Sequence, residues 1–195
     1  MVWESAVLEA FDYVIQPGWK GSEPEHWQSH WAQQLKAYRV ENHDWVDPTP
    51  AAWLHQLDQT LRQAHKPVII IAHSLGCVTV AHYLKHHPSE KLAGVFLVAP
   101  ADVERQHAPE CLARFAPVPT LHFPCPVAVI ASDNDPFCVP QRAQVIAQQW
   151  GATLTWLPHA GHINVASGHT EWAEGLALLE QFALRCRQSA LALAA

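Results

Sequence analysis

Two short stretches of the sequence consist entirely of apolar residues and glycine, Val68–Ala72 and Gly94–Ala99. A strand without polar positions fits a sheet that helices cover on both faces, because side chains on either side of the strand then meet a core. The first stretch leads into a helical pattern over Gly76–His86. Strands that alternate with helices predict a parallel sheet with right-handed crossover connections.

The same alternation continues along the rest of the chain. We predict further strands at Tyr13–Gln16, Tyr38–Val40, Val127–Ala131 and Thr153–Leu157. Further helices are expected at Glu25–Lys36, Pro50–Ala64, Gln141–Trp150 and Glu171–Arg187. Two of these helices have a proline near the first turn, where its missing N–H costs little. The pattern predicts an α/β fold, a three-layer α/β/α sandwich with about six parallel strands.

The length of the chain limits how many domains it can form. Its 195 residues, 49% of them hydrophobic, suffice for one good core. We therefore expect a single domain over residues 1–195, with residues 189–195 as a flexible tail. The proline-rich section between Pro100 and Pro126 shows little periodicity. It is expected to form an irregular connection at the rim of a site.

Composition excludes several classes of partner. Only 15% of the residues are charged, the net charge is −6, and the basic residues are scattered, so no nucleic-acid partner is expected. The longest apolar stretches have about eight residues, well short of the roughly 20 of a membrane helix, and no secretory signal is apparent. Five dispersed cysteines without a CxxC pair are typical of free thiols in a reducing cytoplasm. We expect a cytoplasmic protein without a membrane partner, and the sequence does not indicate its oligomeric state.

Fourteen histidines are an unusual number for this length. The pairs His26/His30 and His159/His162 have spacings that could in principle hold a metal ion. The sequence contains neither an HExxH motif nor a Cys/His set with zinc spacing. We therefore expect ordinary hydrogen-bonded histidines, and neither a metal nor another cofactor.

The pentapeptide Ala72-His73-Ser74-Leu75-Gly76 lies between the first apolar strand and the helix that follows. It is a variant of the G-x-S-x-G nucleophile elbow, in which a serine sits on a strained turn with its hydroxyl exposed. The residues two before and two after the serine crowd together, so both must be small. A serine at a strand-to-helix junction can also be an ordinary N-cap. The apolar strand before it and the small residues after it favour a catalytic Ser74.

A serine hydroxyl needs a general base that a carboxylate orients. In proteins with this elbow the acid and then the histidine follow on loops after later strands. The strand Val127–Ala131 is followed by Asp133 and Asp135, and we favour Asp135 because Pro136 holds it out of the helical region. Asp133, directly at the strand end, fits an Asx-type turn.

Two histidines compete for the role of general base, His159 and His162, both after the strand Thr153–Leu157. We favour His162 because Gly161 before it permits unusual backbone angles and a close approach. His159 directly follows a proline and fits a loop position. Serine, acid and histidine then lie at carboxyl ends of strands, where an open α/β sheet binds its ligand.

An oxyanion formed at the serine needs two backbone N–H donors. The N–H of Leu75, at the start of the helix, is one candidate. The N–H of Trp19, after the first strand and Gly18, is the other, although a plain Pro-Gly turn would look the same. Gly18, Trp27 and Phe137 are candidates for the substrate pocket, and ordinary core packing is the alternative for the aromatic pair.

Several of these motifs occur together in one known family. The sequence resembles the small lidless serine hydrolases similar to retinoblastoma-binding protein 9, in particular their bacterial members, over about Tyr13 to Phe182. The resemblance rests on Pro17-Gly18-Trp19, Glu25-His26-Trp27-Gln28-Ser29, Ala72-His73-Ser74-Leu75-Gly76, Val98-Ala99-Pro100-Ala101-Asp102, Ser132-Asp133-Asn134-Asp135-Pro136-Phe137 and Ala160-Gly161-His162-Ile163-Asn164.

The resemblance implies Ser74 as nucleophile, Asp135 as acid and His162 as base. It also implies a minimal α/β-hydrolase fold, without extra antiparallel strands and without a cap domain. The Leu-x-Cys-x-Glu motif through which the human protein binds the retinoblastoma pocket does not occur here, so that partner is not expected.

Together the residues and the resemblance predict a serine hydrolase. The expected reaction is hydrolysis of small carboxylic esters through an acyl-enzyme on Ser74. Amide or peptide hydrolysis with the same residues is one alternative. A binding module without catalytic activity is the other, because a fold does not determine a function.

Overall fold

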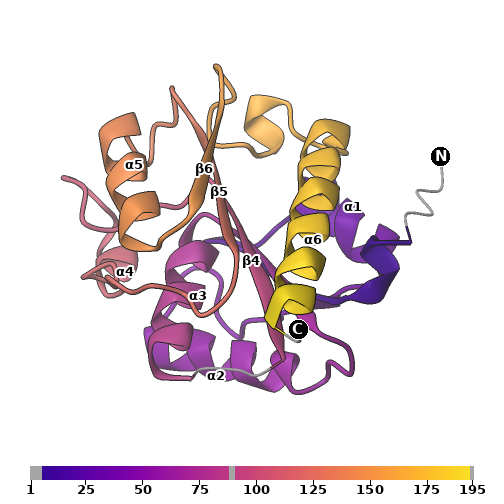
Figure 1. Cartoon of the computed structure of the whole chain (residues 1–195). Coiled ribbons are helices and arrows are strands. Elements are labelled where there is room, and N and C mark those ends of the chain that lie inside the picture. Colours follow the sequence, from indigo (N-terminus) through magenta and orange to yellow (C-terminus); the bar gives the residue numbers. More distant parts are fainter. Residues whose placement is uncertain (1–5, 88–90, 194–195) are drawn as a thin grey trace.

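The computed structural model describes the backbone of residues 6–87 and 91–193 (Figure 1). One sheet of six parallel strands has the order β2-β1-β3-β4-β5-β6. The strands are β1 (Asp12–Gln16), β2 (Tyr38–Arg39), β3 (Val68–His73), β4 (Leu92–Val98), β5 (Val127–Ser132) and β6 (Thr153–Leu157). The predicted α/β class and the parallel six-stranded sheet are confirmed.

Helices cover both faces of this sheet. One face packs against α1 (Trp27–Gln34) and α6 (Ala173–Leu193), and the other against α2 (Pro50–Leu61), α3 (Leu75–His86) and α5 (Pro140–Gln149). Figure 1 shows these two groups on opposite sides of the strands. Single turns complete the described fold: α4 (Glu110–Ala113), η1 (Leu8–Ala10) and η2 (Val165–Ser167). The predicted three layers are confirmed, and the irregular segment after β4 contains only α4.

The central strand β3 is apolar from Val68 to Ala72 because both of its faces are covered. Ile69 and Ile71 belong to the core under α1 and α6, whereas Val68, Ile70 and Ala72 belong to the core under α2, α3 and α5. Successive strand residues point to opposite faces, so a strand between two helical layers must be apolar at every position. All six residues of β3 are buried.

The carboxyl end of the chain differs from the expectation. Residues 189–193 continue helix α6, so the predicted flexible tail over 189–195 is corrected for that part, and Ala194 and Ala195 lie outside the described residues. Alanine and leucine, which dominate this segment, are strong helix formers, and the helix therefore continues. Within the described ranges, no helix is long and apolar enough to cross a membrane.

The packing of α6 on β4 depends on Gly94. A Cβ atom at this position would lie 2.9 Å from the Phe182 ring and closer still to the Cys186 Sγ atom. Gly94→Ala is therefore expected to lower the free energy of unfolding by about 1–3 kcal/mol, the usual cost of overpacking a core. Urea denaturation of the variant and the parent protein measures this difference.

A double-mutant cycle with Cys186→Ala controls for the cause. Removing the sulfur relieves part of the overlap, so the double variant should be more stable than the sum of the single effects implies. Strictly additive effects would show that the contact between β4 and α6 does not account for the loss.

Candidate active site

Ser74 lies between β3 and α3 in a strained backbone conformation. Its φ of 55° and ψ of −123° are rare for a residue with a side chain. Three hydrogen bonds hold it there: its N–H donates to the Val98 carbonyl at 3.1 Å, and its carbonyl accepts from Cys77 at 3.0 Å and Ala101 at 3.3 Å. This is the sharp strand-to-helix turn that the sequence predicts.

The loop after β1 passes directly against this turn. A Cβ atom on Gly76 would lie 2.5 Å from the Gln16 carbonyl oxygen and 2.7 Å from that of Pro17. A Cβ atom on Gly18 would lie 2.8 Å from the Cβ of Ser74. Both glycines are therefore required by close approach; at Gly76 the nearest atoms belong to the β1 loop, and not to Ala72 as expected.

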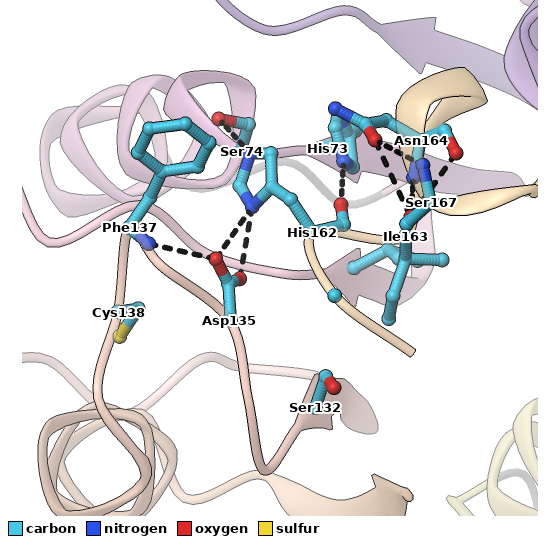
Figure 2. A network of polar contacts seen from close by, with 12 residues as sticks. His73, Ser74, Ser132, Asp135, Phe137, Cys138, His162, Ile163, Asn164 and Ser167 are labelled. Carbon is cyan, nitrogen blue, oxygen red and sulfur yellow. Dashed lines mark hydrogen bonds and ion pairs between the residues drawn. The ribbon is translucent and has the colours of Figure 1, made fainter. Parts of the chain in front are cut away.

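The structure brings the side chains of Ser74, His162 and Asp135 together (Figure 2). The His162 Nε2 atom lies 2.9 Å from the Ser74 Oγ, and its Nδ1 lies 2.8 Å and 3.0 Å from the two carboxylate oxygens of Asp135. The side chains of His162 and Asp135 are only 8% and 3% exposed. Because the carboxylate accepts a hydrogen bond from the Nδ1–H, the neutral imidazole presents Nε2 as an acceptor to the serine hydroxyl.

The competing candidates, Asp133 and His159, lie outside this array and contact each other. Three consecutive side chains at the end of β5 accept hydrogen bonds from three consecutive backbone N–H groups after β6. The pairs are Asp133 with His159 at 2.7 Å, Ser132 with Ala160 at 2.9 Å and Asn134 with Gly161 at 2.7 Å. We call these three hydrogen bonds the β5–β6 loop clamp. Asp133 thus bonds to the neighbouring loop, and not in the Asx-type turn expected for it.

Two buried side chains fix the next residues of the histidine loop. The His73 Nε2–H donates to the carbonyl of His162 at 2.9 Å, and the Trp27 indole N–H donates to that of Ile163 at 2.8 Å. Burial, and then the proximity of His162, lowers the pKa of His73 well below its usual value, so this imidazole is neutral. No pattern in the sequence predicts this role for His73.

A pocket of about 270 Å³ opens over Ser74. Its walls include Trp19, Lys20, His26, Arg105, Phe137 and His162. Phe137 is 38% exposed. Its ring stands edge-on to the His162 ring, with 4.6 Å between the ring centroids, and the Arg105 Cζ atom lies 5.4 Å from the Phe137 centroid. The irregular connection after β4 contributes to the wall, as expected for a rim segment.

The expected pocket role of Trp27 is wrong. Its side chain is fully buried and packs against Trp31 and Trp172 in the core under α1 and α6. Trp27 is the first residue of α1, and its side chain faces the sheet, whereas the preceding residue, His26, faces the pocket. Gly18 does not line the pocket either and supports Ser74 from the β1 side.

The two expected oxyanion donors lie beside the serine. Leu75 is the first residue of α3, and Trp19 follows Gly18, which abuts Ser74. Among the residues that the structure describes, neither backbone N–H donates to a protein acceptor. Neither N–H group is therefore used by the described part of the fold.

Polar side chains hold the Trp19 loop on α1. The Gln28 amide donates to the Gln16 carbonyl at 3.2 Å, and the Ser22 hydroxyl donates to the Gln28 side chain at 2.7 Å. Gln28 is fully buried, so these bonds satisfy groups that would otherwise be costly in the core. They fix the loop that carries Trp19 in the pocket wall.

His26 is a pocket residue for which sequence analysis predicted no role. It precedes α1 as its N-cap, and its Nδ1 accepts from the Gln28 backbone N–H at 3.1 Å. Burial first, and then the nearby charges of His162 and Arg39, lowers its pKa to about 4. No group of three or more potential metal-binding side chains lies together in the part of the chain that the structure describes.

The pKa of His26 gives a direct test of this geometry. Between pH 8 and about pH 5 the ring should stay neutral with its proton on Nε2, and it should gain a proton only near pH 4. Long-range ¹H–¹⁵N NMR of the histidine rings distinguishes the tautomers and follows the titration, and the spectrum of His26→Asn identifies the signal. A ring that titrates near pH 6.5 would contradict the buried, capping position.

Comparison with known proteins gives the family. The serine hydrolase family matches residues 13–181. YdeN of Bacillus subtilis is 26% identical over 168 residues, which cover 81% of this chain and 88% of YdeN, and its crystal structure superposes with a TM-score of 0.76. The crystal structure of a YdeN-like protein from Pectobacterium atrosepticum is 32% identical, with a TM-score of 0.81, over 92% of this chain and 94% of that one.

The matched residues span the sheet and every loop of the site. The two YdeN-related structures share the small sheet-and-helix architecture of this chain, without a cap domain. The chain therefore belongs to the serine hydrolase family related to YdeN and retinoblastoma-binding protein 9, on a minimal α/β-hydrolase fold.

Proposed function

We propose that the protein is a carboxylesterase that hydrolyses small esters through an acyl-enzyme on Ser74. The observation that carries this proposal is the chain of hydrogen bonds from Ser74 through His162 to Asp135 at the base of a pocket. A serine hydroxyl becomes a useful nucleophile when an oriented base can take its proton. Family membership supports the same reaction class.

Acylation transfers one proton through His162. The Ser74 Oγ attacks the ester carbonyl carbon while His162 Nε2 takes the hydroxyl proton, which leaves a tetrahedral oxyanion. As the intermediate collapses, the bond to the alcohol oxygen breaks and His162 returns the proton to that oxygen. Asp135 stabilises the imidazolium and keeps the Nδ1–H tautomer.

Deacylation repeats these steps with water. His162 takes a proton from water, the resulting hydroxide attacks the acyl carbon, and the Ser74 oxygen leaves with that proton. In both halves the backbone N–H groups of Leu75 and Trp19 would stabilise the oxyanion. Their unused hydrogen-bonding capacity beside the serine supports this assignment.

The preference for small substrates rests on the pocket. Its volume of about 270 Å³ lies just below the usual range of about 300–1,000 Å³ for ligand pockets. Trp19 and Phe137 wall it, and the fold lacks a cap that could extend it into a long apolar groove. Such a pocket favours short acyl groups.

Ser74→Ala is expected to abolish labelling by a fluorophosphonate probe and to lower kcat by about 10⁶ on p-nitrophenyl esters of short acids. The variant should keep the far-UV circular dichroism and the urea midpoint of the parent protein. Activity within about tenfold of the parent protein would exclude Ser74 as nucleophile. Unlabelled parent protein with no esterase or peptidase activity would favour a binding module.

The two loop aspartates give a matched pair of variants. Asp135→Asn should lower kcat by about 10⁴, because asparagine favours the wrong tautomer of His162. Asp133→Asn should cost far less, since its side-chain oxygen can still accept from the His159 N–H. Steady-state kinetics on one ester compares them. The reverse order would move the acid role to Asp133.

A further inference from the structure

His26 occupies the pocket wall on the β1 side of Ser74. Its ring centroid lies 5.0 Å from that of His73, which in turn lies 4.8 Å from that of His162. The residue is only 3% exposed, and the surface that it does present lines the pocket. His26 therefore borders the volume that a small substrate would fill.

The hydrogen bond to α1 determines which nitrogen of His26 carries the proton. Nδ1 accepts from the Gln28 backbone N–H, so in the neutral ring Nε2 must be the donor. Within the described residues Nε2 has no hydrogen-bond partner. It is also not one of the unpartnered polar atoms that are fully shielded from solvent. The Nε2–H is therefore accessible, and the accessible surface of this residue faces the pocket.

The ring is a donor without a charge. Burial lowers its pKa to about 4, so near neutral pH it carries no positive charge to attract an anion. A bound ligand that excludes water from the pocket would leave this N–H unpaired, which costs free energy unless the ligand itself supplies an acceptor.

We propose that His26 is a substrate-binding residue whose Nε2–H donates to a second oxygen of the substrate, apart from the scissile carbonyl. The preferred substrates are then small esters that carry an ether, hydroxyl or carbonyl oxygen near the reacting group, and not simple alkyl esters. This inference rests on the proposed esterase function. The backbone N–H groups of Leu75 and Trp19 remain the donors for the scissile carbonyl oxygen.

Isosteric esters test this inference. One set pairs p-nitrophenyl valerate with the ethoxyacetate and 3-methoxypropionate esters, in which an oxygen replaces one methylene of the acyl chain. A second set pairs butyl acetate with 2-methoxyethyl acetate, which places the oxygen on the alcohol side. Each kcat/KM is divided by the rate of alkaline hydrolysis of the same ester, which removes differences in intrinsic reactivity.

His26→Asn separates the pocket donor from the helix cap. Asparagine is a good N-cap, so α1 should keep its cap, while the shorter side chain withdraws the donor from the pocket. His30→Asn, one turn further along α1 and outside the pocket wall, is the matched control.

For each pair we take the corrected kcat/KM of the oxygen-containing ester divided by that of the alkyl ester. In at least one pair this ratio should be about two- to tenfold higher in the parent protein and in His30→Asn than in His26→Asn. Ratios that His26→Asn leaves unchanged in every pair would overturn the inference. An equal loss on all esters would also overturn it, since His26 would then act on a feature common to all of them.

A binding measurement separates this inference from the proposed function. In Ser74→Ala, which cannot form the acyl-enzyme, each ester of the two sets is added in turn, and at least one oxygen-containing ester should shift the His26 Nε2–H signal more than its alkyl isostere does. Failure of the parent protein to hydrolyse any ester, with the shift present, would reject the esterase and keep the His26 site. Hydrolysis without the shift would do the opposite.

Discussion

The close approach of the β1 loop to the turn at Ser74 is the constraint on which the site depends. At Gly76 a single added carbon would meet two backbone carbonyl oxygens, those of Gln16 and Pro17. The same loop carries Gly18 against Ser74 and Trp19 in the pocket wall. A residue held at a φ of 55° costs about 1–3 kcal/mol, and surrounding structure must compensate for it. Hydrogen bonds to β4 and its following loop, together with the glycine contacts, provide that compensation.

The parallel sheet then gathers groups that are distant in the sequence. β3, β5 and β6 all end at the same edge, and each supplies one member of the Ser74, Asp135 and His162 array from the loop that follows it. The last two loops also make hydrogen bonds beyond the strand ends. The β5–β6 loop clamp and the bonds from His73 and Trp27 hold them, so the imidazole is oriented before any substrate arrives.

Much of the fold and the members of the array could be predicted because they depend on local patterns. Apolar strands covered on both faces and a serine between small residues are visible in the sequence itself. Pro136 and Gly161 also pointed to Asp135 and His162, which the structure brings to Ser74.

Other features depend on geometry that a single sequence does not carry. Trp27 and His26 are neighbours, and the first turn of α1 decides which of them faces the core and which the pocket. The side-chain to backbone hydrogen bond of Asp133 links loops that only the folded sheet brings together. The sequence does not predict that α6 continues to Leu193, because a run of alanine and leucine without a polar face gives little sign of its packing.

The β5–β6 loop clamp has a consequence for how sequences of this kind can diverge. On one side the acceptors are side chains, so residues 132–134 must retain an oxygen in reach. On the other side the donors are backbone N–H groups, so the clamp requires a backbone conformation at residues 159–161 and not a particular side chain, although the φ of 53° at His159 and of 58° at Gly161 narrows the choice. Only proline, which lacks the N–H, is excluded there by the clamp itself. Mutational tolerance is thus unequal across one contact, and the exposed His159, whose φ of 53° suits asparagine, aspartate or glycine as well as histidine, should accept exchanges among these few residues close to the reacting imidazole.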